Sequence, residues 1–265
     1  MEYMKKFGFA EKTGIDLAGE ATGIIHKAEN VGPVELATMS FGQSFQITPL
    51  QLLRAASAIV NGGYLITPHF AKGLADENGR LTEEFTYETG AQVISKETSE
   101  TMKAILESVV SEGTGSKAYI PGYRIGGKTA TSEKLPRRSG KYIASFISFA
   151  PAENPQVMAL VLIDEPQGVY YGGTVAGPVM QELLRNILPY LGMEAKYDEK
   201  EAEEAAELKT IVPDLLGMTL NEGKNALFQA GLSARLETEG ETVAGQTPPA
   251  GECVNKGTKV LLRME

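Results

Sequence analysis

The chain has 265 residues, of which 42% are hydrophobic and 22% charged, and its formal net charge is −9 at pH 7. These fractions are typical of a folded globular protein and argue against collagen-like, disordered and membrane-embedded classes. The acidic balance argues against nucleic acid as a partner, because a phosphate backbone requires a basic binding face. A chain of this length can form one large domain and a smaller one.

The sequence offers no candidate for a metal or redox site. It contains one cysteine, Cys253, and two histidines, His26 and His69. A single cysteine cannot form an internal disulfide, and histidines so far apart match no metal-binding motif. We therefore expect structural roles for all three and no cofactor. No apolar run reaches the roughly 18 residues that span a bilayer, and residues 1–20 lack the pattern of a signal peptide.

Three helices are predicted in the first part of the chain from apolar residues at helical spacing. The first covers residues 49–61 and begins after Thr48, whose hydroxyl can cap it. The second follows Ser95 and ends at Gly113, and the third covers residues 176–188.

Three strands are predicted between the second and third helices, at residues 123–132, 142–149 and 157–163. The last two are rich in β-branched and aromatic residues, and a turn at residues 151–155 joins them. Short connections between consecutive strands imply an antiparallel sheet. With helices on its flanks, this sheet predicts the α+β fold class.

The first of these strands contains a sequence that also matches a phosphate-binding loop. Gly122, Gly127, Lys128 and Thr129 together spell G-x-x-x-x-G-K-T, and residues 161–165 resemble a strand that ends in metal-binding acids. A phosphate loop requires a helix that begins at the Lys-Thr pair, because that helix presents its amides to the phosphates. Residues 130–140 contain a proline and almost no apolar periodicity. We therefore predict a strand here and keep a P-loop NTPase only as a distant third hypothesis.

A series of short segments follows one another along the chain, at residues 7–17 with Gly19 and Glu20, and at residues 37–43, 48–52, 58–63, 113–115, 127–131, 144–146 and 171–173. Taken in this order, the segments resemble those of class B penicillin-binding proteins, the D,D-transpeptidases that cross-link peptidoglycan. The resemblance covers most of residues 1–190. It implies the C-terminal part of a penicillin-binding, β-lactamase-like transpeptidase domain at residues 1–191, with an antiparallel sheet flanked by helices.

The resemblance implies a substrate-binding strand at Lys128, Thr129, Ala130 and Thr131. In this family a Lys-Thr-Gly triplet lies beside the active-site serine. Lys128 would act as a catalytic cation, while the hydroxyls of Thr129 and Thr131 would hold the terminal carboxylate of a D-Ala-D-Ala stem peptide or of a β-lactam. Ala130 stands where the family has glycine, and we expect its methyl group to crowd the pocket.

The sequence lacks the family's nucleophile motif, Ser-x-x-Lys, and its Ser-x-Asn motif. Thr114-x-x-Lys117 and Thr131-x-x-Lys134 are the nearest matches, and both are misplaced. The resemblance places both motifs upstream of the segment at residues 7–17. We therefore expect the C-terminal portion of a longer protein on the extracytoplasmic face of the cell membrane, with its anchor outside this chain, and we expect this chain alone to be inactive. The alternative is a non-catalytic peptidoglycan-binding or scaffold protein.

An acidic segment, predicted as a linker at residues 192–208, follows the transpeptidase-like part. Residues 192–209 hold seven acidic residues and three lysines. Residues 209–265 resemble a PASTA domain, a small α+β module, through residues 212–218, 246–251 and 256–260 and a predicted helix at residues 219–230.

The resemblance also names the expected partners. These are peptidoglycan stem peptides and β-lactams, together with proteins of cell-wall synthesis. For the PASTA domain, a structural or protein-contact role and wall binding both stay open. A transpeptidase followed by one PASTA domain resembles both sporulation-type and vegetative members of the family.

Overall fold

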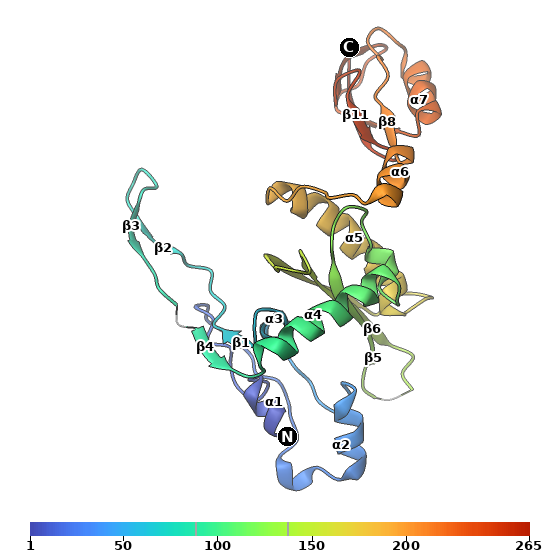
Figure 1. Cartoon of the computed structure of the whole chain (residues 1–265). Coiled ribbons are helices and arrows are strands. Elements are labelled where there is room, and N and C mark those ends of the chain that lie inside the picture. Colours follow the sequence, from blue (N-terminus) through green and yellow to red (C-terminus); the bar gives the residue numbers. More distant parts are fainter. Residues whose placement is uncertain (88, 137) are drawn as a thin grey trace. The chain divides into compact units, whose positions relative to one another are not determined.

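The computed structural model describes residues 1–87, 89–136 and 138–265 (Figure 1). The chain divides into two compact units, Met1–Glu194 and Ala195–Glu265. Within the described residues, every helix is too short or too polar to cross a membrane.

The first unit is built around an antiparallel sheet with the strand order β5-β6-β7. Its strands are β5 (Gly126–Glu133), β6 (Tyr142–Ala150) and β7 (Val157–Asp164). Two hairpins connect them, and the register runs unbroken from one end of each strand to the other. The predicted antiparallel sheet and the α+β class are therefore confirmed.

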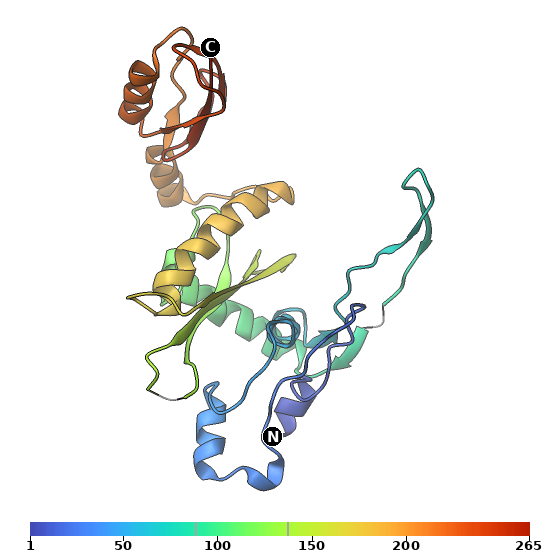
Figure 2. The same cartoon turned by 180° about the vertical axis from the view of Figure 1, so that it is seen from behind.

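The main core lies between this sheet and helix α5 (Gly172–Tyr190) (Figure 2). The helix buries Ala176, Met180, Leu184 and Leu188, which are spaced four residues apart and so share one face. Phe146 of the central strand β6 is fully buried against them. Together these side chains fix the helix across one face of the sheet.

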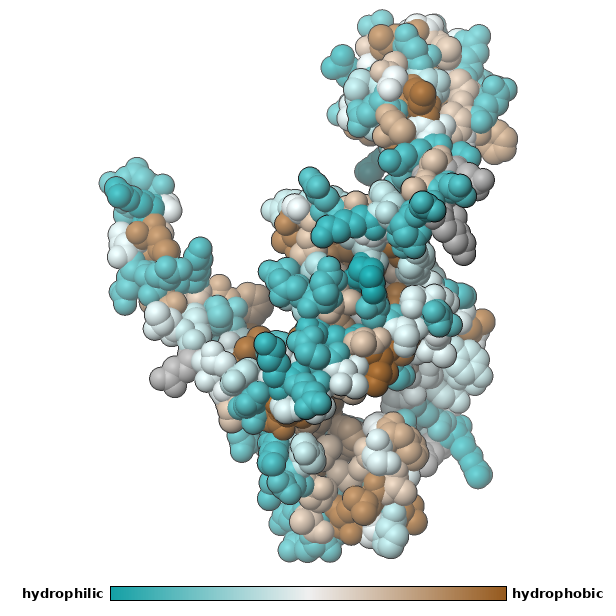
Figure 3. All heavy atoms as spheres, viewed as in Figure 1, coloured by the Kyte–Doolittle hydropathy of each residue, from teal (hydrophilic) through white to brown (hydrophobic). Residues whose placement is uncertain are grey.

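The remaining elements of the first unit precede the sheet in sequence. They are α1 (Glu2–Lys6), η1 (Ala28–Asn30), α2 (Pro33–Ser40), α3 (Pro49–Val60), β1 (Tyr64–Ile66), β2 (Gly73–Ala75), β3 (Leu81–Glu84), β4 (Thr89–Gln92), α4 (Lys96–Ser111) and η2 (Ser116–Ala118). Val60 at the end of α3 packs with Phe149 of β6, which faces away from α5. Helix α4 turns a hydrophilic side to solvent (Figure 3).

The three predicted helices are present. Thr48 and Gln51 form a reciprocal capping box at the start of α3, and the Ser95 hydroxyl caps α4. Helix α5 begins at Gly172, four residues earlier than predicted, because glycines are weak helix formers and this start depends on packing against β5. Strand β5 begins at Gly126 instead of residue 123, since a backbone hydrogen bond from Tyr123 to Ile120 forms a turn there.

The second unit contains two helices and two small sheets. Its elements are α6 (Glu199–Glu207), β8 (Lys209–Ile211), α7 (Leu220–Gln229), β9 (Ser233–Leu236), β10 (Val243–Thr247), β11 (Cys253–Asn255) and β12 (Lys259–Met264). One sheet has the order β10-β12-β9, and β8 pairs with β11 in the other.

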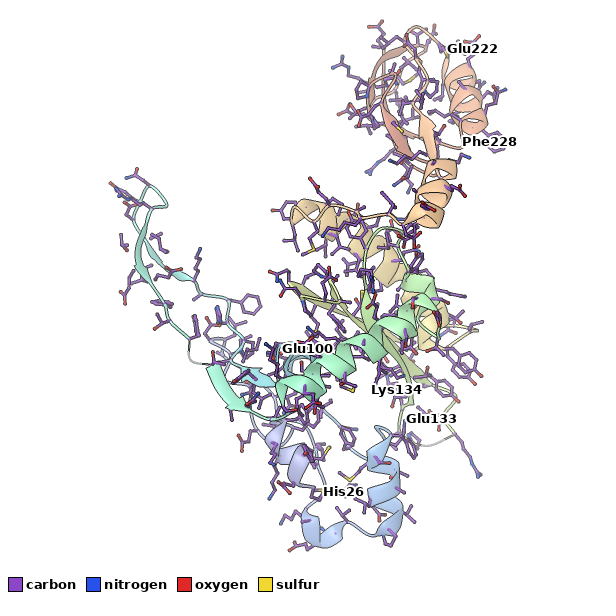
Figure 4. The ribbon with its side chains drawn as sticks, viewed as in Figure 1. His26, Glu100, Glu133, Lys134, Glu222 and Phe228 are labelled. Atoms are coloured by element: carbon purple, nitrogen blue, oxygen red, sulfur yellow. The ribbon has the colours of Figure 1, made fainter. Side chains whose placement is uncertain are left out.

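Helix α7 supplies the buried Leu227 to the core of the second unit, against Val243, Val260 and Leu262. Thr219 and Glu222 form its capping box, and Phe228 lies on its exposed side (Figure 4). The predicted helix at residues 219–230 is therefore confirmed.

Candidate functional site

The four predicted site residues, Lys128 to Thr131, lie together on β5. This strand pairs with β6 on one side only, and among the described residues no strand pairs with its other side. Lys128 and Ala130 are exposed, while Thr129 and Thr131 are half-buried. Because side chains alternate along a strand, the two threonines point toward α5 and the other two residues point away from it.

Thr131 joins the strand to the start of helix α5. Its Oγ1 accepts a hydrogen bond from the backbone N–H of Gly172 at 3.0 Å. A side chain at Gly172 would overlap the carbonyl oxygens of Ala130 and Ser145, so only glycine allows this close approach. The start of α5 is thereby held directly against the site strand.

Thr129 contacts the loop that follows α4. Its Oγ1 lies 3.4 Å from Oγ1 of Thr114. A side chain at Gly173 would overlap the carbonyl oxygen of Thr114, so α5 also approaches this loop closely. The structure therefore brings together three segments that are far apart in sequence, at residues 113–115, 127–131 and 171–173. The spacing of these segments along the chain did not identify Thr114 as a neighbour of Thr129.

Lys128 lies at the exposed edge of the strand. Its Nζ donates a hydrogen bond to the carbonyl oxygen of Thr129 at 2.7 Å. No acidic partner is found for this ammonium group in the parts of the chain that the structure describes. The group can therefore turn toward an anionic or polar ligand at the strand edge.

An aromatic cluster lies next to the site. Tyr142, which pairs with Glu133 at the end of β5, stacks on Tyr170 with ring centres 4.0 Å apart. Tyr171, just before α5, lies 4.7 Å from Tyr170 and is 59% exposed. A hydrogen bond with Tyr170 raises the pKa of Tyr171. The exposed ring provides an apolar surface beside the threonines that the sequence analysis did not predict.

The acidic end of β7 takes part in ion pairs with lysines. Lys134 Nζ lies 2.9 Å from Asp164 and 2.8 Å from Glu165, and Lys141 lies 3.0 Å from Glu165. The hydrogen bonds with Glu165 and Asp164 raise the pKa of Lys134, and those with Lys134 and Lys141 lower the pKa of Glu165. The carboxylates of Asp164 and Glu165 are therefore both paired with lysine ammonium groups.

The geometry also excludes a phosphate loop. Strand β5 continues through Lys128 and Thr129 to Glu133, and no helix begins there. Without that helix the Lys-Thr pair cannot place helical amides around a phosphate. The prediction that this sequence is a strand is confirmed. Among the described residues, no group of three or more His, Cys, Asp or Glu side chains is placed to hold a metal ion.

Two protein-family models match the chain. The model of the penicillin binding protein transpeptidase domain matches residues 1–185, and the PASTA domain model matches residues 210–265. Stage V sporulation protein D of Bacillus subtilis (strain 168) is 43% identical over 268 residues, which cover 98% of this chain and 41% of that protein. A probable peptidoglycan D,D-transpeptidase PenA of Neisseria meningitidis is 32% identical, over 72% of this chain and 32% of that protein.

Among solved structures, too, the chain is similar to penicillin-binding proteins. The transpeptidase domain of Burkholderia pseudomallei penicillin-binding protein 3 has a TM-score of 0.64 and 32% identity, and the match covers 74% of this chain and 58% of that one. Penicillin-binding protein 3 of Mycobacterium tuberculosis, complexed with ampicillin, has a TM-score of 0.66 and 25% identity over 75% of this chain and 47% of that one. This chain therefore spans less than two thirds of each of these relatives.

Proposed function

Because this chain belongs to the penicillin-binding protein transpeptidase family and also carries a PASTA domain, we propose that it forms the substrate-binding part of a peptidoglycan D,D-transpeptidase site. The observation that carries the proposal is the position of Lys128, Thr129 and Thr131 on a strand with one free edge. This edge binds the D-Ala-D-Ala end of a stem peptide, or a β-lactam of similar shape.

Each part of the strand has a chemical task in this proposal. The free backbone groups of β5 pair with the extended peptide and align its scissile carbonyl. The hydroxyls of Thr129 and Thr131 donate to the terminal carboxylate, and the Lys128 ammonium adds positive charge beside it. Thr131 can donate its proton to a ligand because its oxygen already accepts from Gly172.

The reaction proposed for this family site is serine acyl transfer. A serine Oγ attacks the carbonyl carbon of the penultimate D-alanine, the terminal D-alanine leaves, and an amino group of a second stem peptide then displaces the serine from the ester. The 265 residues contain neither Ser-x-x-Lys nor Ser-x-Asn. We therefore propose that this chain alone forms no acyl-enzyme.

Labelled penicillin tests the proposal. The chain by itself is expected to form no covalent adduct. The same chain, joined to an upstream segment that carries the family's Ser-x-x-Lys and Ser-x-Asn motifs, is expected to form one that unlabelled penicillin prevents.

Two controls make this result decisive. Replacing the serine of the added Ser-x-x-Lys segment with alanine should abolish the adduct, whereas Lys128→Gln should reduce it. An adduct on the unextended chain would contradict the missing nucleophile. A joined chain that folds but forms no adduct would contradict the role of β5.

A second candidate function is a non-catalytic peptidoglycan-binding or scaffold protein. Ala130 favours it, because this residue replaces the family's glycine on the exposed edge strand. In that case the joined chain would sediment with insoluble peptidoglycan without reacting with penicillin.

The cellular setting also belongs to the proposal. We place the parent protein at the extracytoplasmic face of the cell membrane, where its peptidoglycan substrate is found. The 43% identity to a sporulation protein supports a sporulation role over a vegetative one. Immunogold labelling of sporulating and vegetative cells tests both points.

A further inference from the structure

The second unit has an exposed sheet face that the proposed transpeptidase reaction does not use. This face belongs to the sheet β10-β12-β9, whose opposite face packs against α7 through Val260 and Leu262. Because side chains alternate along each strand, Leu261 and Arg263 of β12 point away from this core. Within the second unit, the described residues place no helix or strand over this outer face.

The outer face holds a cavity of about 150 Å³. Its lining residues are Glu237, Gly245, Gln246, Thr247, Leu261 and Arg263. Leu261 supplies an apolar surface, Arg263 comes from the same strand, and Glu237 directly follows the neighbouring strand β9. A cavity of this size suits a group of a few heavy atoms better than a drug-sized ligand.

Glycine at position 245 creates part of this cavity. Gly245 pairs with Arg263 across the strands, and the Arg263 guanidinium lies over the space that a Cβ atom of residue 245 would occupy. Its Nη2, Nε and Cζ atoms would lie 3.3, 3.4 and 3.5 Å from that Cβ. The absence of a side chain at residue 245 therefore leaves room for the guanidinium beside the cavity.

Glu237 brings the opposite charge to the same cavity. The backbone N–H of Glu237 donates to Leu262 O at 2.9 Å, which continues the parallel pairing of β9 with β12 and makes Glu237 the neighbour of Arg263. In the parts of the chain that the structure describes, neither side chain forms an ion pair or a hydrogen bond. A cation and an anion thus face one cavity, and both can bind a ligand.

We propose that this cavity binds a small zwitterionic group, one that carries a carboxylate and an ammonium a few bonds apart, as the head group of an α-amino acid does. The carboxylate binds the planar guanidinium of Arg263, which can donate two parallel hydrogen bonds. The ammonium binds the carboxylate of Glu237, and the side chain of the ligand lies against Leu261. Arg235 and Lys259 lie on the same face and add positive charge around the site.

Nuclear magnetic resonance titration of the full chain tests this site with three probes at equal ionic strength: L-alanine, acetate and methylammonium. Alanine is expected to shift the amide signals of Gly245, Thr247 and Leu261 in a saturable way. Acetate and methylammonium can use only one of the two charges, so each is expected to bind at least about tenfold more weakly.

Four variants separate the site from general electrostatics. Arg263→Gln and Glu237→Gln are each expected to weaken alanine binding about tenfold, whereas the matched Arg235→Gln removes a charge outside the cavity and should leave it within about twofold. Gly245→Val should fill the cavity and abolish binding while it retains both charges. Unshifted core signals from Leu227 and Val260 verify that each variant is folded.

Three results would overturn the site. These are no saturable shift with alanine, equal affinities for alanine and acetate, or full binding by Arg263→Gln or Glu237→Gln. Because the cavity lies in the second unit, none of these results depends on whether the first unit reacts with penicillin.

Discussion

At the scale of single residues, Thr131 is the side chain that most directly links structure to the proposed function. Its hydroxyl accepts from Gly172 and retains one proton for a ligand carboxylate. We expect Thr131→Val to slow penicillin acylation of the joined chain by about 10- to 100-fold, because a hydrogen bond to a charged group contributes about 1.5–3 kcal/mol. Stopped-flow measurement with a fluorescent penicillin gives the rate. Thr131→Ser retains the hydroxyl and should stay within a few-fold of the parent, and an equal loss in both variants would contradict the hydrogen-bond role.

Ala130 raises a different question at the neighbouring position. Its side chain is exposed and points away from α5, on the same side as Lys128. If the methyl group crowds the ligand, Ala130→Gly should increase the acylation rate of the joined chain above that of the parent. Ala130→Val, which enlarges the side chain, should decrease the rate below that of the parent. Measurement of both rates against the parent decides the point. No difference among the three would mean that the methyl group lies outside the binding pocket.

Two buried serines allow a stability prediction with a matched control. Ser148 on β6 is fully buried, and among the described residues its hydroxyl has no hydrogen-bond partner. Removing it relieves a desolvation penalty of about 1–3 kcal/mol. We expect Ser148→Ala to increase the free energy of unfolding by about 1 kcal/mol, as measured by urea titration.

Ser99 supplies the control. It is equally buried, but its Oγ donates to Ile59 O at 2.7 Å and accepts from Gly62 N at 3.0 Å. Ser99→Ala should therefore decrease the free energy of unfolding by about 1–3 kcal/mol. Destabilisation by both substitutions would show that the Ser148 hydroxyl has a partner after all.

At the scale of structural elements, the β2–β3 hairpin is held at its base by one carboxylate. Asp16 accepts hydrogen bonds from Phe70 N at 2.9 Å and Ala71 N at 2.8 Å, and Tyr87 Oη donates to Ala71 O at 2.6 Å. His69 stacks on Tyr87 at 3.6 Å. A two-stranded hairpin is marginally stable by itself, so these contacts determine whether it stays ordered.

The Asp16 contacts predict a pH dependence. The hydrogen bonds from Ala71 and Phe70 hold the pKa of Asp16 below its ordinary value. A lowered pKa in the folded state means that the stabilisation is complete above the unfolded-state value of about 3.9 and is lost as the pH falls through the lower folded-state value. The amide signals of Phe70 and Ala71 should therefore titrate below about pH 4. Asp16→Asn should abolish this titration, and Asp76→Asn, in the hairpin turn, should leave it intact.

The elements differ in how far the sequence predicts them. Local chemistry is enough for α3, since Thr48, Pro49 and Gln51 all favour a helix start at that point. It fails for α5, whose first residues, Gly172 and Gly173, adopt a helix because β5 and the Thr114 loop lie against them. The same limit applies to the site: the strand at Lys128 is predictable from its residues, whereas the contact of Thr129 with Thr114 arises only when the chain folds.

At the scale of the whole molecule, the two units have separate cores. Leu184 lies in the core under α5, and Leu227 lies in the core under α7, and no buried residue is shared between these two clusters among the described residues. Because each unit has its own core, we expect each unit to unfold in a separate cooperative transition. Among the side chains of the acidic helix α6 that the structure describes, none belongs to either cluster.

Separate cores predict independent responses to a cavity in either unit. Leu184→Ala and Leu227→Ala each remove a fully buried side chain and should cost about 2–5 kcal/mol. In differential scanning calorimetry we expect two transitions, with Leu184→Ala lowering only one and Leu227→Ala lowering only the other. Because the substitutions are chemically identical, each serves as the control for the other. One transition that shifts with either substitution would mean that the units unfold together, and the PASTA domain would then stabilise the transpeptidase unit directly.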